Sequence, residues 1–246
     1  MILARGDGFG RGLLVKTDAA GYGQGDDQQH TAVQAGLVKV MNEAAEAAQL
    51  TRNVWFTQRA GDGELALLPS TESEPRVVDD FVRELDAALG RHNLGLEPDH
   101  RLRLRVGIHF GVAYPAPNGL AGQAVVAVSR LVDCRPLREA LAGADLVNLA
   151  LVLSGRVFEE TVQQGHTSHR PETFRKVTVR HKEYRGDAWI RVPGADVHRL
   201  ELSDDPPATS PEARPHARGE ARHPVVVNEF NERVDARRAV FGVIHK

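Results

Sequence analysis

Apolar residues recur along the first half of the chain with two periods that alternate. Short apolar or alternating runs, which are typical of strands, occupy residues 13–17, 53–58, 64–68 and 102–112. Apolar residues at helical spacing occupy residues 28–50 and 75–93. The predicted order is therefore βαββαβ, the pattern of ferredoxin-like α+β folds, in which helices pack on an antiparallel sheet.

The second half continues with mixed elements and then loses its apolar periodicity. Helices are predicted at 123–132, 136–142 and 156–163, with a buried strand at 147–153 and a hairpin at 174–192. Beyond about residue 202 the chain is rich in Pro, Ala and charged residues, a composition that does not offset the entropy of ordering. We therefore expect four parts: a flexible lead at 1–11, a domain at 12–202, a disordered linker at 203–223 and a β-prone tail at 224–246.

Composition narrows the class of protein. The net charge of −2 gives no broad attraction to nucleic acid or to an anionic membrane surface. The single cysteine, Cys134, excludes an intramolecular disulfide framework and fits a reducing compartment. No apolar run approaches the roughly 20 residues that a transmembrane helix needs. We expect a cytoplasmic protein with neither a nucleic-acid nor a membrane partner.

Two aspartates occupy matching places in the predicted sheet. Asp18 follows the first strand, and Asp62 lies in the tight turn between the second and third strands. In a βαββαβ sheet the first and third strands are neighbours, so the two carboxylates should meet at one end of the sheet. Such a pair suits Mg²⁺ or Mn²⁺, with phosphate oxygens completing the coordination. Taken singly, each aspartate is more simply explained as a cap or turn residue.

A glycine-rich loop follows Asp18. Gly21, Tyr22 and Gly23 lie between the first strand and the first helix, where backbone N–H groups can bind phosphate. Metal ions beside such a loop can activate an attacking hydroxyl and neutralise a leaving pyrophosphate. The residues alone thus predict a metal-dependent site that binds phosphate groups.

Four segments resemble, in order and spacing, the landmarks of the class III nucleotidyl cyclases. They are Thr17-Asp18-Ala19-Ala20-Gly21-Tyr22, Gly61-Asp62-Gly63, Arg-Val-Gly-Ile-His-Phe-Gly at 105–111, and Gly-Gln-Ala-Val-Val-Ala-Val-Ser-Arg at 122–130. The resemblance covers roughly residues 12–193 and implies conversion of a nucleoside triphosphate to a cyclic nucleotide. It also implies two bound Mg²⁺ or Mn²⁺ ions on Asp18 and Asp62.

The same resemblance implies a homodimer with shared active sites. Arg130 would stabilise the reacting phosphorus of a nucleotide held by the aspartates of the other subunit. Lys182, near the final hairpin, is the candidate for contacting the terminal phosphates.

Three positions depart from the cyclase pattern. Gln58 replaces the adenine-reading lysine, the second base-reading position falls near Asn118 or Gly119, and Val126 replaces a catalytic asparagine. One interpretation is a different base, since Gln58 and Asn118 can each donate and accept hydrogen bonds, as in the pyrimidine cyclases of bacterial antiphage signalling that the chain then resembles. The other is a domain without catalysis that survives as a regulatory or effector module.

The tail has a resemblance of its own. Residues 228–231 and 240–245 resemble the RHIM-like amyloid signalling motifs of bacterial immune effectors, although the usual core glutamine is replaced by Val240 or Phe241. A short, apolar, β-prone segment can template cross-β stacking, which implies an amyloid-motif partner for residues 224–246. The alternative is an edge strand that folds back onto the domain.

Overall fold

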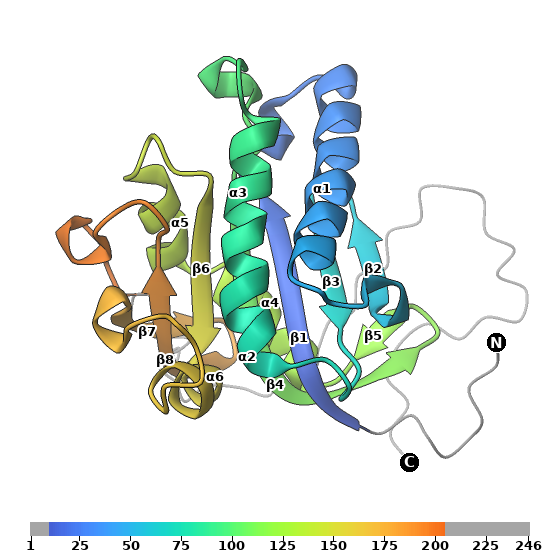
Figure 1. Ribbon diagram of the computed structural model, residues 1–246, viewed down its shortest axis with the longest axis vertical. Helices are drawn as coiled ribbons and strands as arrows, with labels where there is room; N and C mark the ends of the chain where they lie inside the picture. The colour runs from blue at the N-terminus through green and yellow to red at the C-terminus, as the bar shows by residue number, and fades with distance from the viewer. Residues whose placement is uncertain (1–9, 205–246) are drawn as a thin grey trace, which may run out of the picture. The chain divides into compact units, whose positions relative to one another are not determined.

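The computed structural model describes residues 10–204, which lie in one compact unit of the chain (Figure 1). The first strand, β1, begins at Gly10, two residues before the domain boundary expected from the sequence. Residues 1–9, the linker from residue 205 onward and the tail at 224–246 lie outside the described residues. The expectations for those segments therefore stay predictions.

A single mixed sheet organises the described residues. Its order is β2-β3-β1-β4-β6-β8-β7, and β5 pairs with β4 beside this path. Every pairing is antiparallel except that of β4 with β6. The strand bounds are β1 Gly10–Ala19, β2 Phe56–Ala60, β3 Gly63–Leu67, β4 Leu104–Ala116, β5 Gly119–Ala121, β6 Leu149–Ser154, β7 Arg175–His181 and β8 Tyr184–Arg191. The predicted α+β class and the adjacency of the first and third strands are confirmed.

Two long helices cover one face of the sheet. The first, α1, spans Asp27–Ala47, and the second is a continuous helical stretch made of α2 Glu74–Arg76, a π-helical turn at Val77–Phe81 and α3 Val82–His92. Figure 1 shows α1 and α3 side by side in front of the sheet. Their buried side chains form the largest core with the inward residues of β1 and β4, among them Val15 and Ile108. Burial of these alternating apolar residues is the main force that holds the layer together.

Helices α4 and α5 cover the opposite face. Helix α4, Gln123–Val132, packs on Leu14 and Leu65, which point away from α1 and α3. It lies so close to β4 that a Cβ on Gly107 would be 2.6 Å from a methyl carbon of Val132. Helix α5, Arg135–Ala142, closes a second core over β6, β7 and β8. The short α6, Gly155–Val157, continues into a π-helical turn at Phe158–Val162, and the buried apolar side chains of both belong to the core of α1 and α3.

The structure departs from the sequence prediction at two local points. Residues Arg52–Val54 form a 3₁₀ turn rather than the start of a strand, because Trp55 turns into the core and donates its indole N–H to Glu72. The short strand β5 was not expected. It begins at Gly119, whose φ of +107° follows the two-residue turn that folds the chain back on β4. In the described range no helix is long and apolar enough to cross a membrane.

Candidate functional site

The strand order brings Asp18 and Asp62 to the same end of the sheet. Asp18 is the penultimate residue of β1 and lies opposite Gly63, the first residue of β3. The backbone N–H of Ala19 donates to the carbonyl of Asp62 at 2.8 Å, which joins the end of β1 directly to the hairpin turn. Both aspartate side chains are half-buried. The predicted meeting of these two residues is therefore present in the fold.

Glycines give the hairpin its shape at this point. Gly61 has φ of +49°, a left-handed conformation that glycine adopts without strain. Any side chain on Gly63 would collide with the carbonyl oxygen of Thr17. The two glycines thus let the turn that contains Asp62 approach β1 closely.

Arg105 is a site residue to which the sequence analysis assigned no role of its own. It lies on β4 directly opposite Asp18, and its guanidinium forms an ion pair with the Asp18 carboxylate. The exposed fractions of the two side chains are 16% and 14%. Burial raises the pKa of the Asp18 carboxyl above its usual value, although Arg105 acts in the opposite direction. Only the pairing of β1 with β4 reveals this contact.

The carboxylate oxygens at this end of the sheet supply some, but not all, of the ligands that a hard divalent cation needs. Asp62 and Asp133 are close enough to Asp18 that their negative charge also raises its pKa. Within residues 10–204, however, no three His, Cys, Asp or Glu side chains form a ready-made metal cluster. Oxygen ligands are what Mg²⁺ prefers, and Mg²⁺ commonly takes one or two carboxylates while water and substrate phosphate complete its shell. Two aspartates suit that arrangement and do not make a closed structural site.

The glycine-rich loop consists of one glycine in the left-handed backbone conformation followed by a 3₁₀ turn. Gly21 has φ of +79°, and the 3₁₀ turn spans Tyr22–Gln24. The Tyr22 ring stacks on His30 with ring centroids 4.3 Å apart, and its hydroxyl accepts a hydrogen bond from Gln34. The loop is thereby held against α1.

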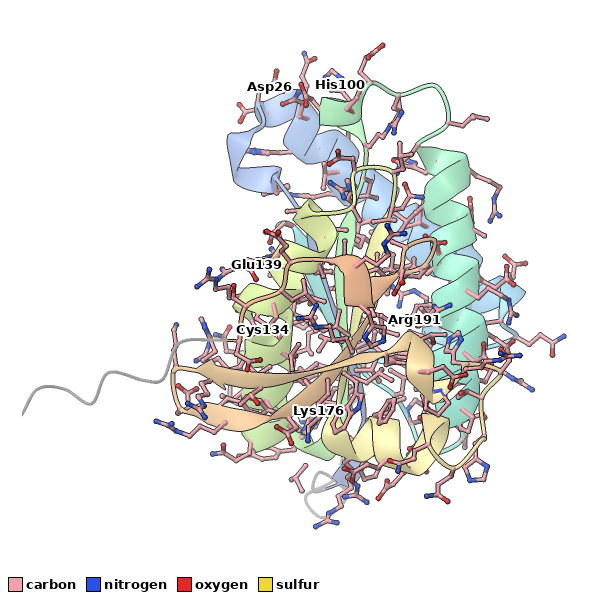
Figure 2. The ribbon with its side chains drawn as sticks, turned by 90° about the vertical axis from the view of Figure 1, so that its left-hand side faces the viewer. Asp26, His100, Cys134, Glu139, Lys176 and Arg191 are labelled. Atoms are coloured by element: carbon pink, nitrogen blue, oxygen red, sulfur yellow. The ribbon has the colours of Figure 1, made fainter. Side chains whose placement is uncertain are left out.

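The N-terminus of α1 is already capped. The Asp26 carboxylate accepts from the N–H of Gln29 at 2.8 Å, and the Gln29 side chain accepts from the N–H of Asp26. Figure 2 shows Asp26 at one end of the domain, together with His100. An anion at this helix end would meet the carboxylates of Asp26 and Asp27. The loop at Gly21, Tyr22 and Gly23 therefore remains the candidate for phosphate, without help from the helix N-terminus.

Arg130 and the turn that contains Lys182 lie together elsewhere on the domain. Arg130, on α4, donates through Nε and Nη2 to one oxygen of Glu183 at 3.1 and 2.9 Å. Glu183 and Lys182 form the exposed turn between β7 and β8, where Lys182 has φ of +53°. A hydrogen bond from its own backbone N–H, followed by Arg130, lowers the pKa of the Glu183 carboxyl. Glu183 is a second residue that sequence reasoning did not find.

A surface pocket of about 820 Å³ lies beside this ion pair. It is bounded by the end of β4, the first turns of α4 and the β7–β8 turn. Val126 and Glu183 are both in its wall. The pocket thus opens at the position where the cyclase pattern would have an asparagine.

Gln58 and the Asn118 turn also meet. The Gln58 Oε1 atom accepts the backbone N–H of Leu120 at 3.0 Å, and a side chain on Gly119 would collide with the Gln58 amide. Asn118 is exposed in the same turn. Because the backbone N–H can only donate, it fixes the orientation of the amide, and the Gln58 Nε2 is the group left to donate.

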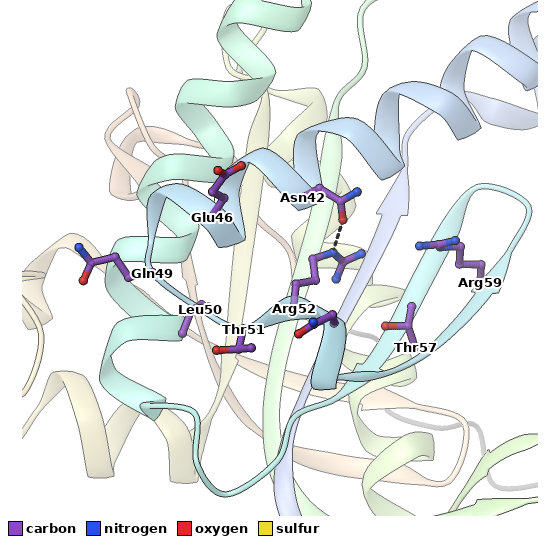
Figure 3. A pocket seen from close by; sticks show the side chains of 9 residues that line it. Asn42, Glu46, Gln49, Leu50, Thr51, Arg52, Thr57 and Arg59 are labelled. Carbon is purple, nitrogen blue, oxygen red and sulfur yellow. Dashed lines mark hydrogen bonds between the residues drawn. The ribbon is translucent and has the colours of Figure 1, made fainter. Parts of the chain in front are cut away.

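A second pocket, of about 710 Å³, lies between α1, the link that follows it and β2 (Figure 3). Side chains around it connect the hairpin to α1. Arg52 reaches from the link before β2 toward Asn42 on α1, to which its Nε donates at 2.8 Å. Its Nη2 binds both carboxylate oxygens of Glu64 at 2.6 Å. Glu64, which is 2% exposed, is the second residue of β3 and also pairs with Arg59. This buried ion pair ties α1 to the hairpin that contains Asp62.

Sequence comparisons do not assign the chain to a family, whereas structural comparisons identify its fold. No protein-family model and no curated protein match the chain. An adenylate/guanylate cyclase/hydrolase from Silicibacter pomeroyi matches at 19% identity and a TM-score of 0.52, over 75% of this chain and 99% of that one. The guanylyl cyclase Cya2 matches at 18% identity and a TM-score of 0.52, over 79% and 98%.

A third solved structure supports the same conclusion. A bacterial light-regulated adenylyl cyclase matches at 13% identity and a TM-score of 0.51, over 74% of this chain and 89% of that one. At these identities the likeness establishes architecture, and activity needs its own argument. Residues 10–204 of this chain therefore have the fold of adenylate and guanylate cyclase domains.

Proposed function

We propose that this protein is a divergent nucleotidyl cyclase that converts a nucleoside triphosphate to a 3′,5′-cyclic nucleotide and pyrophosphate. The observation that supports the proposal most is the meeting of Asp18 with Asp62 at the ends of β1 and the β2–β3 turn, in a chain with a cyclase-domain fold. Asp18 and Asp62 would hold two Mg²⁺ or Mn²⁺ ions. Such ions activate an attacking hydroxyl and neutralise charge on the phosphates.

A complete site requires a second copy of the chain. Arg130 is paired with Glu183, whereas Asp18 is paired with Arg105. Within one subunit the two aspartates and the two basic residues, Arg130 and Lys182, therefore lie in separate places. In a two-fold homodimer, Arg130 and Lys182 of one subunit would face the phosphates held by the aspartates of the other. Arg130 suits this role because a guanidinium offers fixed donors to developing negative charge on phosphate.

We propose that the site does not select strongly for a purine base. The Gln58 Nε2 and the exposed Asn118 amide lie at one turn, and both can contact the edge of a base. We propose UTP or CTP as substrates, and a role in bacterial signalling or antiphage defence in the cytoplasm.

The second candidate is a catalytically silent regulatory or effector module. Val126, in the wall of the pocket beside Arg130, cannot donate a hydrogen bond. Loss of one preorganised donor typically lowers the rate by about 10²–10³-fold. In this alternative, assembly through residues 224–246 and an amyloid-motif partner replaces turnover.

One experiment separates the two candidates. The full chain is incubated with each of the four nucleoside triphosphates and Mn²⁺, and the products are resolved by mass spectrometry. We expect a cyclic nucleotide from UTP or CTP and none from the Asp62→Asn variant. If no triphosphate yields a cyclic product, the regulatory module becomes the better account.

A further inference from the structure

Asp18 already has a counterion. Of the charged groups that act on its carboxyl, Arg105 is the cation, while Asp62 and Asp133 are acids. The Arg105 Nη2 donates to the Asp18 Oδ2, and its Nε is buried with no hydrogen-bond partner among the described residues. Asp18 therefore neutralises the charge of the guanidinium and accepts its hydrogen bond.

A divalent ion at Asp18 would bind the same carboxylate, to whose Oδ2 atom Arg105 donates. Asp18 and Arg105 face each other across paired strands, so neither backbone moves away easily. A metal that binds Asp18 competes with Arg105 for the carboxylate, and its positive charge repels the guanidinium, which is mostly buried. Leaving a buried charge unpaired is costly, and the cost is removed only if an anion arrives with the metal.

We propose that Arg105 is a lock on the metal site, which makes metal and triphosphate bind together. The metal-free protein holds Asp18 closed with Arg105 and binds a divalent ion weakly. A triphosphate opens the lock because its negative charge lets Arg105 release Asp18. This inference deepens the proposed function and rests on Asp18 being a metal ligand.

The direct test is Mn²⁺ affinity without nucleotide. Electron paramagnetic resonance of free Mn²⁺ gives the dissociation constant for the full chain and for Arg105→Gln. Removing one charge-assisted hydrogen-bonded competitor should tighten Mn²⁺ binding on the order of tenfold. The matched control, Arg105→Lys, keeps the positive charge and should stay within about threefold of the native chain. Adding Asp18→Asn to Arg105→Gln should abolish the gain in Mn²⁺ affinity.

A second measurement needs no variant, in case Arg105→Gln does not fold. Thermal unfolding of the native chain is followed with Mn²⁺, with inorganic tripolyphosphate and with both. A ligand that binds only the folded state raises the melting temperature by mass action. We expect the rise with both ligands to exceed the sum of the two single rises.

The outcomes distinguish the lock from the metal site. If Arg105→Gln and the native chain bind Mn²⁺ equally, while Asp18→Asn loses it, the metal site stands and the lock is wrong. If Mn²⁺ alone gives the whole rise in melting temperature, the lock is also wrong. If Mn²⁺ binds no form, with or without tripolyphosphate, both the lock and the proposed function fail.

Discussion

Arg130 is bound through two of its nitrogens to a single oxygen of Glu183, the residue that follows Lys182 in the β7–β8 turn. The Arg130 side chain is 20% exposed and that of Glu183 is 56% exposed. The pair thus holds the proposed catalytic guanidinium against Glu183 in the wall of the pocket, and in the proposed site a triphosphate would displace that carboxylate.

Glu183→Gln should therefore tighten substrate binding. Removing the competing negative charge should lower KM for the preferred triphosphate by about two- to fivefold, the scale of an exposed ion pair. The neighbouring change Lys182→Ala should raise KM, since it removes a positive charge from the same turn. Steady-state kinetics of both variants measure these two changes in KM. An increased KM in Glu183→Gln would mean that the carboxylate positions Arg130 for catalysis instead.

Mixed variants should test the shared site. Asp18→Ala and Arg130→Ala should each be inactive as homodimers. A random mixture is half heterodimer, and each heterodimer has one intact site of two, so about a quarter of native activity should return. Subunit exchange is verified by differential tagging. If activity does not return despite verified exchange, the site lies within one subunit.

Gln58 should read the base through its donor. Gln58→Glu keeps the acceptor for the Leu120 N–H and replaces the Nε2 donor with an oxygen. We expect kcat/KM for the preferred base to fall by about tenfold, equivalent to about 1.4 kcal/mol. The native chain should favour ATP over UTP or CTP by less than about tenfold. Unchanged kinetics in Gln58→Glu would remove this residue from base recognition.

His109 should make the fold sensitive to acid. Burial, followed by the charge of Arg156, lowers the pKa of His109 to about 4. Since the unfolded chain binds this proton near pH 6.5, protonation favours unfolding, and stability is lost as the pH falls from about 6.5 toward 4. The loss should be on the order of 3 kcal/mol.

Urea unfolding at pH 7, 5.5 and 4.5 measures this effect. The half-buried histidines His92 and His169, whose pKa values burial also lowers, contribute with the same sign. The comparison with His109→Gln isolates His109, because only its contribution disappears. A variant whose stability falls as steeply as that of the native chain would show that His109 is readily protonated in the fold.

The tail should be separable from the domain. Deleting residues 224–246 should leave the melting temperature unchanged, because the described sheet and its cores are built from residues that precede the predicted linker. The isolated peptide should form fibrils with a spacing of about 4.7–4.8 Å. A peptide that stays monomeric at high concentration would exclude the amyloid hypothesis, and a lower melting temperature after deletion would favour an edge strand.

The sequence by itself determined the order of the first six main elements and the meeting of Asp18 with Asp62. Hydrophobic periodicity reports which residues face a core, and the βαββαβ order makes the first and third strands neighbours. These conclusions depend on local patterns and on a topology that few alternatives satisfy.

Only the tertiary structure decided which side chains meet. Arg105 contacts Asp18 across 87 residues, Leu120 contacts Gln58 across 62, and Glu183 contacts Arg130 across 53. Each contact depends on the exact pairing of strands or on the placement of a turn, and a shift of one residue would turn the side chains to the other face. Periodicity has no information about such a shift, so the partners of Asp18, Gln58 and Arg130 had to come from the fold.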